Sequence, residues 1–357
     1  MKINNYIHRN IWACLILGIA LSFVACSDDS TDEPLNGPSP AIGFFSNQIE
    51  EIGTRALVTV DNLKSQKIGV YGYKKKADDT DHMLVFDNTE LSHNGSSWNY
   101  TPLRYWDLSR SYSFLAYIPY ETNDDNNNDI YNVEYGDAGT SKYTDILTFK
   151  NIQQWQKIDG NETDYLVASS ASSADNYINN NKGTVNLVFK HIYAQLLISV
   201  KKDIMGESTT THTVTGLRFG EDSGSEIPDI QPCTYQHDAN NAANSKVTST
   251  RTNGKITFLD NGNVVADVTE VRPLAHYLVA PFTTQNSASL YIDYTVSDGS
   301  NTTTHNNVKV EIGKLDFKSN NKYTYVLRFE AGKPILVSIA EVKEWESEEV
   351  TDEVYNW

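Results

Sequence analysis

The stretch YSFLAYI, from Tyr112 to Ile118, carries the pattern that decides the fold. It is short, and its aromatic and other large apolar residues favour extended backbone over helix. KIGVYGY at Lys67–Tyr73, LYIDYTV at Leu290–Val296 and YTYVLRF at Tyr323–Phe329 have the same character. Several stretches alternate apolar and polar residues, as half-buried antiparallel strands do. Further strands are expected at Trp98–Tyr100, Tyr165–Ala168, Val185–Phe189, Leu196–Val200, Val214–Phe219, Ile256–Leu259, Tyr277–Phe282, Val308–Ile312 and Ile335–Ile339.

Turn signals separate these stretches along the whole chain. Clusters of Asn, Asp, Ser and Gly, which favour turns, occur at Asn123–Asp129, Asn179–Gly183, Asp298–Asn301 and Ser319–Lys322. No long segment repeats apolar residues at the helical period, and His191–Leu196 could form one helical turn at most. Many short strands with frequent turns predict an all-β chain of β-sandwiches, with Asn179–Gly183 as the seam between two domains.

The first 25 residues have the features of a secretory signal peptide. Lys2 and Arg9 precede an uncharged apolar run, Ile11–Val24, of the length expected of a signal-peptide core. The run is too short, and too soon followed by polar sequence, to predict a membrane span. We expect residues 1–25 to be removed on export, leaving residues 26–41 as an acidic, flexible, proline-containing linker.

The exported chain is acidic. The formal charge is −17, and removing Lys2 and Arg9 with the signal peptide changes it by two units to −19. Binding to nucleic acid or to an anionic membrane surface depends on clustered Lys and Arg. The one basic run, Lys74–Lys76, is interpreted as part of a solvated polar turn, so we expect no nucleic-acid partner.

Cysteine is scarce. Cys14 lies in the apolar run and Cys26 follows that run, so the rest of the chain contains only Cys233. A single thiol cannot form an intrachain disulfide. We therefore expect the fold to depend on core burial, and Cys233 to be buried and chemically inert.

The sequence contains no recognisable catalytic or cofactor pattern. It has no Gly-rich phosphate loop, no His-Glu-x-x-His and no Cys-x-x-Cys, so we predict neither an enzyme nor a cofactor. No histidines pair at metal-ligand spacing, and His191 is interpreted as a hydrogen-bonded core residue. Asp125–Asp129 (DNNND) resembles the start of a calcium loop, but Ile130 and Gly136 stand where an EF-hand needs Gly and Glu. A solvated turn is therefore favoured there, and calcium binding stays an open alternative.

The segment LSFVACS, Leu21–Ser27, resembles the bacterial lipobox, in which small residues precede a lipidated Cys. The resemblance implies cleavage before Cys26 and attachment of diacylglycerol and palmitate, whose buried CH₂ groups each contribute about 0.8 kcal/mol to membrane anchoring. The acidic stretch Ser27–Glu33 resembles the surface-export tag of lipoproteins from Gram-negative anaerobes. Together these features imply a surface-exposed lipoprotein of the outer membrane. The alternative is an ordinary signal peptide in which Cys26 has no role.

A set of ordered landmarks resembles the fimbrillin family. WNYTPLRYW at Trp98–Trp106 and YSFLAYIP at Tyr112–Pro119 resemble the family signature W-x-Y-x-P-x-x-Y-W … F-x-A-Y-x-P. Four further family landmarks are similar to Ile68–Tyr73 (IGVYGY), Val188–Leu196 (VFKHIYAQL), Asn321–Leu327 (NKYTYVL) and Val342–Trp345 (VKEW). The set spreads over residues 42–345, nearly the whole exported chain.

This resemblance implies two tandem transthyretin-like β-sandwich domains, residues 42–182 and 183–357. The implied fold agrees with the strand pattern read from the residues alone. Aromatic side chains bury large areas, so those of the signature are expected in the core rather than at a ligand site. They are Trp98, Tyr100, Tyr105 and Trp106.

The resemblance also implies a route of assembly. In the family, an Arg- or Lys-specific protease removes an N-terminal segment, for which residues 42–55 and the bond between Arg55 and Ala56 are the counterparts here. Removing a strand would leave a groove that a C-terminal segment of another subunit can fill. Pro334–Val342 (PILVSIAEV) is the candidate donor. The alternatives are that Arg55 is an ordinary loop residue, or that the chain is an anchor pilin that keeps this segment and its lipid.

The favoured function is a fimbrial subunit or accessory pilin at the outer-membrane surface. It would form a homo- or heteropolymer with other fimbrial subunits and support adhesion to a host or bacterial surface ligand. The alternative is a glycan-binding surface lipoprotein of a polysaccharide uptake system, in which Trp98, Trp155 and Tyr235 would be exposed platforms. A surface hydrolase is the third hypothesis, and it lacks a visible site.

Overall fold

The computed structural model describes residues 39–49, 60–78, 81–122, 130–137, 140–203, 209–221, 226–228, 232–241, 244–253, 255–330 and 335–344. The predicted signal peptide with Cys26, the predicted processing residues Arg55 and Ala56, and the Asp125–Asp129 run lie outside these ranges. Within them, no helix combines the length and apolar character that crossing a membrane requires.

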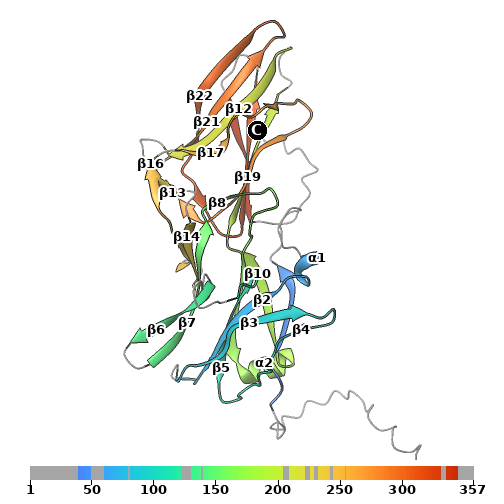
Figure 1. Cartoon of the computed structure of the whole chain (residues 1–357), viewed down its shortest axis with the longest axis vertical. Coiled ribbons are helices and arrows are strands. Elements are labelled where there is room, and N and C mark those ends of the chain that lie inside the picture. Colours follow the sequence, from blue (N-terminus) through green and yellow to red (C-terminus); the bar gives the residue numbers. More distant parts are fainter. Residues whose placement is uncertain are drawn as a thin grey trace, which may run out of the picture. The chain divides into compact units, whose positions relative to one another are not determined.

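The described residues fold mainly into β-strands, which confirms the predicted all-β class (Figure 1). The strands are β1 Gly43–Ile49, β2 Ile68–Lys75, β3 Met83–His93, β4 Trp98–Asn99, β5 Ser111–Ile118, β6 Ile130–Asp137, β7 Thr140–Gln153, β8 Trp155–Lys157, β9 Leu166–Ser173, β10 Thr184–His191, β11 Ala194–Lys202, β12 Thr211–Glu221, β13 Glu226–Pro228, β14 Pro232–Asp238, β15 Lys246–Thr248, β16 Arg251–Asn253, β17 Ile256–Leu259, β18 Val264–Val265, β19 Arg272–Val279, β20 Phe282–Thr283, β21 Ala288–Ser297, β22 Thr302–Gly313, β23 Asp316–Phe317, β24 Asn321–Phe329 and β25 Leu336–Glu344. The helices are α1 Val60–Leu63 and α2 Ala174–Asn181.

The N-terminal sheet has the strand order β1-β10-β9-β5-β2-β3-β4. Its central strand β5 is the YSFLAYI stretch, and both faces of that strand are buried. Phe114 and Ile118 belong to one hydrophobic core, whereas Leu115 and Tyr117 belong to another. A strand covered on both faces needs a continuous apolar run, which explains why this stretch does not alternate.

A second sheet, β15-β14-β7-β6, supplies the layer over one face of β5. Phe149 of β7 and Tyr235 of β14 share a core cluster with Leu115 and Tyr117 of β5. The strands β7 and β14 are antiparallel neighbours although they are far apart in sequence (Figure 1). This sheet therefore ties together segments from the two predicted domains.

The C-terminal half forms a β-sandwich. One sheet has the order β25-β24-β11-β19-β8 and the other β17-β12-β21-β22. Inward residues of both sheets share a single core, as in facing layers of a sandwich. Trp155 lies in this core, and its indole N–H donates a hydrogen bond of 3.0 Å to the Pro228 carbonyl.

Strand pairing continues across the predicted domain boundary at residues 182 and 183. The strand β10 follows that boundary but pairs with β9 and β1 of the N-terminal sheet. Conversely, β8 precedes the boundary and pairs with β19 of the C-terminal sandwich. A division into tandem domains stays a prediction, with β10 on the N-terminal side of any such division.

The helix α2 is a correction to the predicted turn at Asn179–Gly183. The Ser173 hydroxyl accepts a hydrogen bond from the Asn176 N–H at the start of the helix. At the end, Lys182 has a left-handed backbone with φ of 52°, and Gly183 follows with φ of 76°. The predicted turn is therefore the last helical turn and its C-terminal cap.

Candidate functional site

The N-terminal strand β1 occupies a slot at one edge of the N-terminal sheet. It runs parallel to β10, with Gly43 paired to Thr184 and Phe45 to Asn186. Its other neighbour is the segment Trp98–Trp106, called here the aromatic segment. The strand β1 therefore lies between the regular strand β10 on one side and the mostly irregular aromatic segment on the other.

Backbone hydrogen bonds hold the start of β1 on both sides. The Gly43 N–H donates to the Gly183 carbonyl at 3.0 Å, beside β10. On the opposite side, the Ile42 N–H donates to the Arg104 carbonyl at 2.8 Å, and the Trp106 N–H donates to the Pro40 carbonyl at 3.2 Å. The backbone in this slot is therefore paired as in a sheet interior.

Side chains of the aromatic segment also bind the backbone of β1 and its neighbours. The Tyr100 hydroxyl donates to the Ile42 carbonyl at 2.8 Å, and the Trp98 indole N–H donates to the Ser46 carbonyl at 3.3 Å. The Trp106 indole N–H donates to the Gly183 carbonyl at 3.1 Å. Residues of the sequence signature therefore hold the N-terminal strand in place by hydrogen bonds to backbone carbonyls. Their spacing alone does not reveal this role.

A pocket of three aromatic rings receives Phe44 of β1. The Phe44 ring lies 5.3 Å from Phe86, 5.8 Å from Tyr100 and 5.7 Å from Phe114, each in edge-to-face geometry. Edge-to-face pairs are worth about 0.5–1.5 kcal/mol beyond burial. Phe44 is 6% exposed, whereas the adjacent Phe45 is 48% exposed. The side chains of β1 therefore alternate between core and surface, as strand geometry requires.

The positions next to Phe44 on the inner face are also buried. Ile42 is enclosed, and the Ser46 hydroxyl donates a hydrogen bond of 3.0 Å to the Leu187 carbonyl. The buried side chains on this face are therefore aliphatic at Ile42, aromatic at Phe44, and small and polar at Ser46. The predicted removable segment 42–55 is described as far as Ile49, and Arg55 and Ala56 lie outside the described residues.

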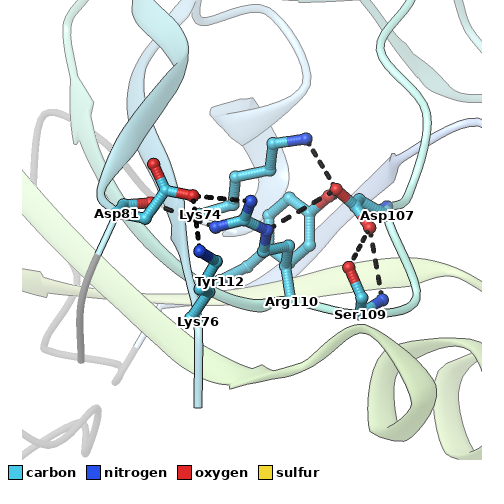
Figure 2. Close-up of polar contacts among 7 residues, drawn as sticks. All are labelled: Lys74, Lys76, Asp81, Asp107, Ser109, Arg110 and Tyr112. Carbon is cyan, nitrogen blue, oxygen red and sulfur yellow. Dashed lines mark hydrogen bonds and ion pairs between the residues drawn. The ribbon is translucent and has the colours of Figure 1, made fainter. Parts of the chain in front are cut away.

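An ion-pair network holds the loop that follows the aromatic segment (Figure 2). Lys74 Nζ lies 3.0 Å from Asp107 Oδ2, and Arg110 lies 2.8 Å from Asp81. The Ser109 hydroxyl donates to Asp107 at 2.7 Å. This hydrogen bond and the nearby Lys74 ammonium lower the pKa of Asp107. The network connects the end of β2 to the loop that follows Trp106.

The basic run at Lys74–Lys76 is partly mispredicted. Lys74 and Lys75 are the last residues of β2, and the Lys74 side chain, which pairs with Asp107, is only 21% exposed. Lys76 follows the strand and pairs with Asp81 at 3.4 Å. The predicted solvated turn therefore applies at most to Lys76.

The predicted aromatic core is confirmed with one correction. Trp98, Tyr100 and Trp106 are buried. Tyr105 is 58% exposed, because its backbone bridges to Ala41 while its side chain faces outward. The predicted glycan platforms are wrong: they are core residues, with exposures of 7% for Trp98, 2% for Trp155 and 2% for Tyr235.

The candidate donor strand lies at a sheet edge. Within the described residues, β25 pairs antiparallel with β24 and has no other neighbour in its sheet. The predicted segment Pro334–Val342 falls mostly within β25, and Pro334 lies outside the described residues. The donor role stays a prediction.

His191 and Cys233 are buried, as predicted. His191 Nδ1 lies 2.7 Å from Asp164 Oδ2, and both side chains are enclosed. Burial raises the pKa of the Cys233 thiol to about 12, which keeps it protonated and unreactive. In the part of the chain that the structure describes, no three His, Cys, Asp or Glu side chains gather as metal ligands.

Comparison with known proteins gives a family match and similar solved structures. The sequence model of the Fimbrillin-like family matches residues 54–345. A fimbrial protein from Bacteroides vulgatus is 20% identical, with a TM-score of 0.59 over 85% of this chain and 99% of that chain. A proposed cell adhesion protein from Bacteroides uniformis is 14% identical, with a TM-score of 0.44 over 88% of this chain and 100% of that chain. No curated protein matches.

Proposed function

The chain belongs to the fimbrillin-like family, and from that membership we propose that it is a fimbrial subunit or accessory pilin that assembles by exchange of the β1 strand. The observation that carries the exchange is the slot itself. A strand near the N-terminus fills a core pocket through Phe44 and is bound along both sides. Such a strand is the part of a subunit that a strand from another subunit could replace.

Loss of β1 would expose two surfaces to water that are unfavourable there, an apolar pocket and an unpaired strand edge. The ring pocket of Phe86, Tyr100 and Phe114 would be exposed, and the edge of β10 would lose its parallel partner. Exposed apolar pockets and unpaired strand edges favour the addition of an extended peptide. An incoming strand would restore both the hydrogen bonds and the burial.

Processing at Arg55 would decide between two states of the subunit. The bond between Arg55 and Ala56 follows the end of β1 at Ile49, so cleavage would sever β1 and Cys26 from the body of the protein. A chain lipidated at Cys26 and left uncut would remain anchored at the outer membrane. A cut chain would be free to exchange the strand and to enter a fimbrium.

N-terminal sequencing of the protein isolated from its own cells tests the processing. A mature start at Ala56 supports a polymerising subunit. A blocked, acylated Cys26 supports an anchored accessory pilin. A start at any other residue would contradict both processing at Arg55 and lipidation at Cys26.

Assembly is tested with the cut protein and its cognate subunits. We expect a ladder of polymers on a gel after mild heating, and an Arg55→Gln variant exposed to the same protease should form no ladder. A cut protein that remains strictly monomeric beside its cognate subunits would overturn the proposed function.

A further inference from the structure

We propose that the β1 slot selects its occupant by an aromatic side chain in the Phe44 pocket, and therefore takes its strand from a different subunit rather than from a second copy of this chain. The selection rests on the proposed function, because it concerns the strand that replaces β1.

The hydrogen bonds of the slot cannot provide this selection. Trp98 and Tyr100 donate to the carbonyl oxygens of Ser46 and Ile42, which are backbone atoms. Any extended peptide offers the same carbonyls. These bonds therefore set the position and direction of an occupant but not its sequence.

The Phe44 pocket does discriminate between sequences. Its walls are three buried rings: Phe86 of β3, Tyr100 of the aromatic segment, and Phe114 of the central strand β5. Buried rings on a paired sheet relax only partly when a neighbour shrinks, so a small side chain would leave a void. Affinity should therefore fall steeply when the aromatic residue is lost.

The candidate donor of this chain does not meet that requirement. Pro334–Val342 (PILVSIAEV) contains no aromatic residue. The next aromatic residue, Trp345, has Lys343 two positions before it. With Trp345 in the pocket, Lys343 would take the place of Ile42, which is 1% exposed, and burying an unpaired ammonium is strongly unfavourable. The two remaining C-terminal aromatic residues fit no better, since Tyr355 in the pocket would bring Glu353, and Trp357 would bring Tyr355, to the enclosed position of Ile42. A second copy of the chain is thus a poor donor in each of these registers.

Peptide binding to the full chain tests the selection. A specific protease site replaces residues 51–56, the chain is cut, and mild denaturant removes the severed strand before refolding. Fluorescent peptides are then bound: residues 40–49, the same peptide with Phe44→Ala, the matched control with Phe45→Ala, and residues 333–344 with and without Val337→Phe. The uncut chain serves as the blank.

We expect Phe44→Ala to weaken peptide binding by at least thirtyfold and Phe45→Ala to change it by less than threefold. The 333–344 peptide should bind at least tenfold more weakly than 40–49, and Val337→Phe should recover at least fivefold. Equal binding of the Phe44→Ala and unmodified peptides would overturn the selection, as would tight binding of unmodified 333–344. Failure of every peptide, 40–49 included, would instead count against strand exchange itself.

Discussion

Two adjacent phenylalanines on β1 have opposite environments. Phe44 lies in the ring pocket, whereas Phe45 faces solvent. In the full, uncut chain, Phe44→Ala should lower the free energy of unfolding by about 3–5 kcal/mol, because it leaves a void in the core. Phe45→Ala should cost less than about 1 kcal/mol. Guanidinium unfolding of both variants gives the comparison, and equal losses would contradict a packed strand.

Cys233 should be inert in the folded protein. Burial raises the pKa of its thiol to about 12, so almost none of it is thiolate at pH 8. In a chain that begins at Ser27 and so lacks Cys14 and Cys26, we expect no reaction with a thiol reagent under native conditions and one thiol per chain in denaturant. Fast native reaction would show that the cluster around Cys233 opens readily.

The pKa of Asp107 predicts a pH-dependent contribution to stability. The Ser109 hydrogen bond and Lys74 lower this pKa, so the folded state binds the proton less tightly than the unfolded chain, whose carboxyl has a pKa of about 3.9. The stabilisation is therefore present above about pH 4 and is lost as pH falls through the folded pKa.

Asp107→Asn tests that contribution. We expect a loss of less than about 1 kcal/mol at pH 7, since the side chain is partly solvated, and a smaller loss at pH 3. Asp87→Asn, at an exposed position of β3, is the matched control. A difference that grows toward acid pH, measured by urea unfolding, would reverse the assigned sign.

Some of these residue environments follow from the sequence and others do not. The dense aromatic signature predicts the burial of Trp98 and Trp106, and an isolated cysteine predicts a buried thiol. The outward side chain of Tyr105 depends on its backbone bridge to Ala41, a contact between distant segments that local pattern cannot show. The position of Trp155 was ambiguous for a different reason, because a tryptophan suits a core and a ligand platform equally well.

At the scale of elements, Gly69, the first of two glycines in the strand β2, makes room for an aromatic ring on β5. Gly69 is paired with Tyr117, and a Cβ at Gly69 would lie 2.2 Å from that ring. The Tyr117 hydroxyl is fixed by a hydrogen bond of 2.6 Å to the Asn88 amide oxygen, so the ring cannot easily move aside.

Gly69→Ala should therefore destabilise the N-terminal sheet by about 1–3 kcal/mol, the usual cost of overpacking. Thermal and chemical unfolding measure the loss. In a double-mutant cycle, the cost of Gly69→Ala should fall sharply when Tyr117→Leu removes the ring. Additive losses would mean that the two residues do not contact.

Many of the strands were predictable, but the long strands β3, β6, β7 and β14 were not predicted, and neither were the partners of any strand. Short aromatic stretches identify β2, β5 and β24 to within a few residues. The helix α2 escapes the apolar period because its sequence, ADNYINNN, has few apolar residues; its Ser173 cap and the Lys182–Gly183 end are the usable signals. The parallel pairing of β1 with β10 joins residues far apart in sequence, so no local signal reports it.

At the scale of the whole molecule, the sheet β15-β14-β7-β6 links the two halves of the sequence. Its β7 and β14 come from opposite sides of residue 182, and its core includes Tyr71 as well as Leu278. We expect a single cooperative unfolding transition for the described body, seen equally by far-UV and near-UV circular dichroism. Two separated transitions would show that the halves unfold independently.

The class of fold was predictable at this scale, whereas the division into domains was not. Strand-rich composition and regular turns predict sandwiches from the residues alone. A boundary placed at a polar turn assumes that each half is closed by its own strands. Here β8 and β10 each pair across that line, and such exchanges depend on tertiary packing.

The parallel alignment of β1 with β10 has a consequence for any fibre built through this slot. An occupant that satisfies the same donors must run in the direction of β1, so every joint would have the same orientation. A contact of this head-to-tail kind does not close on itself when the rotation between neighbours leaves it open. The fibre would be polar, with one end that always offers a free strand and another that always offers a vacant slot.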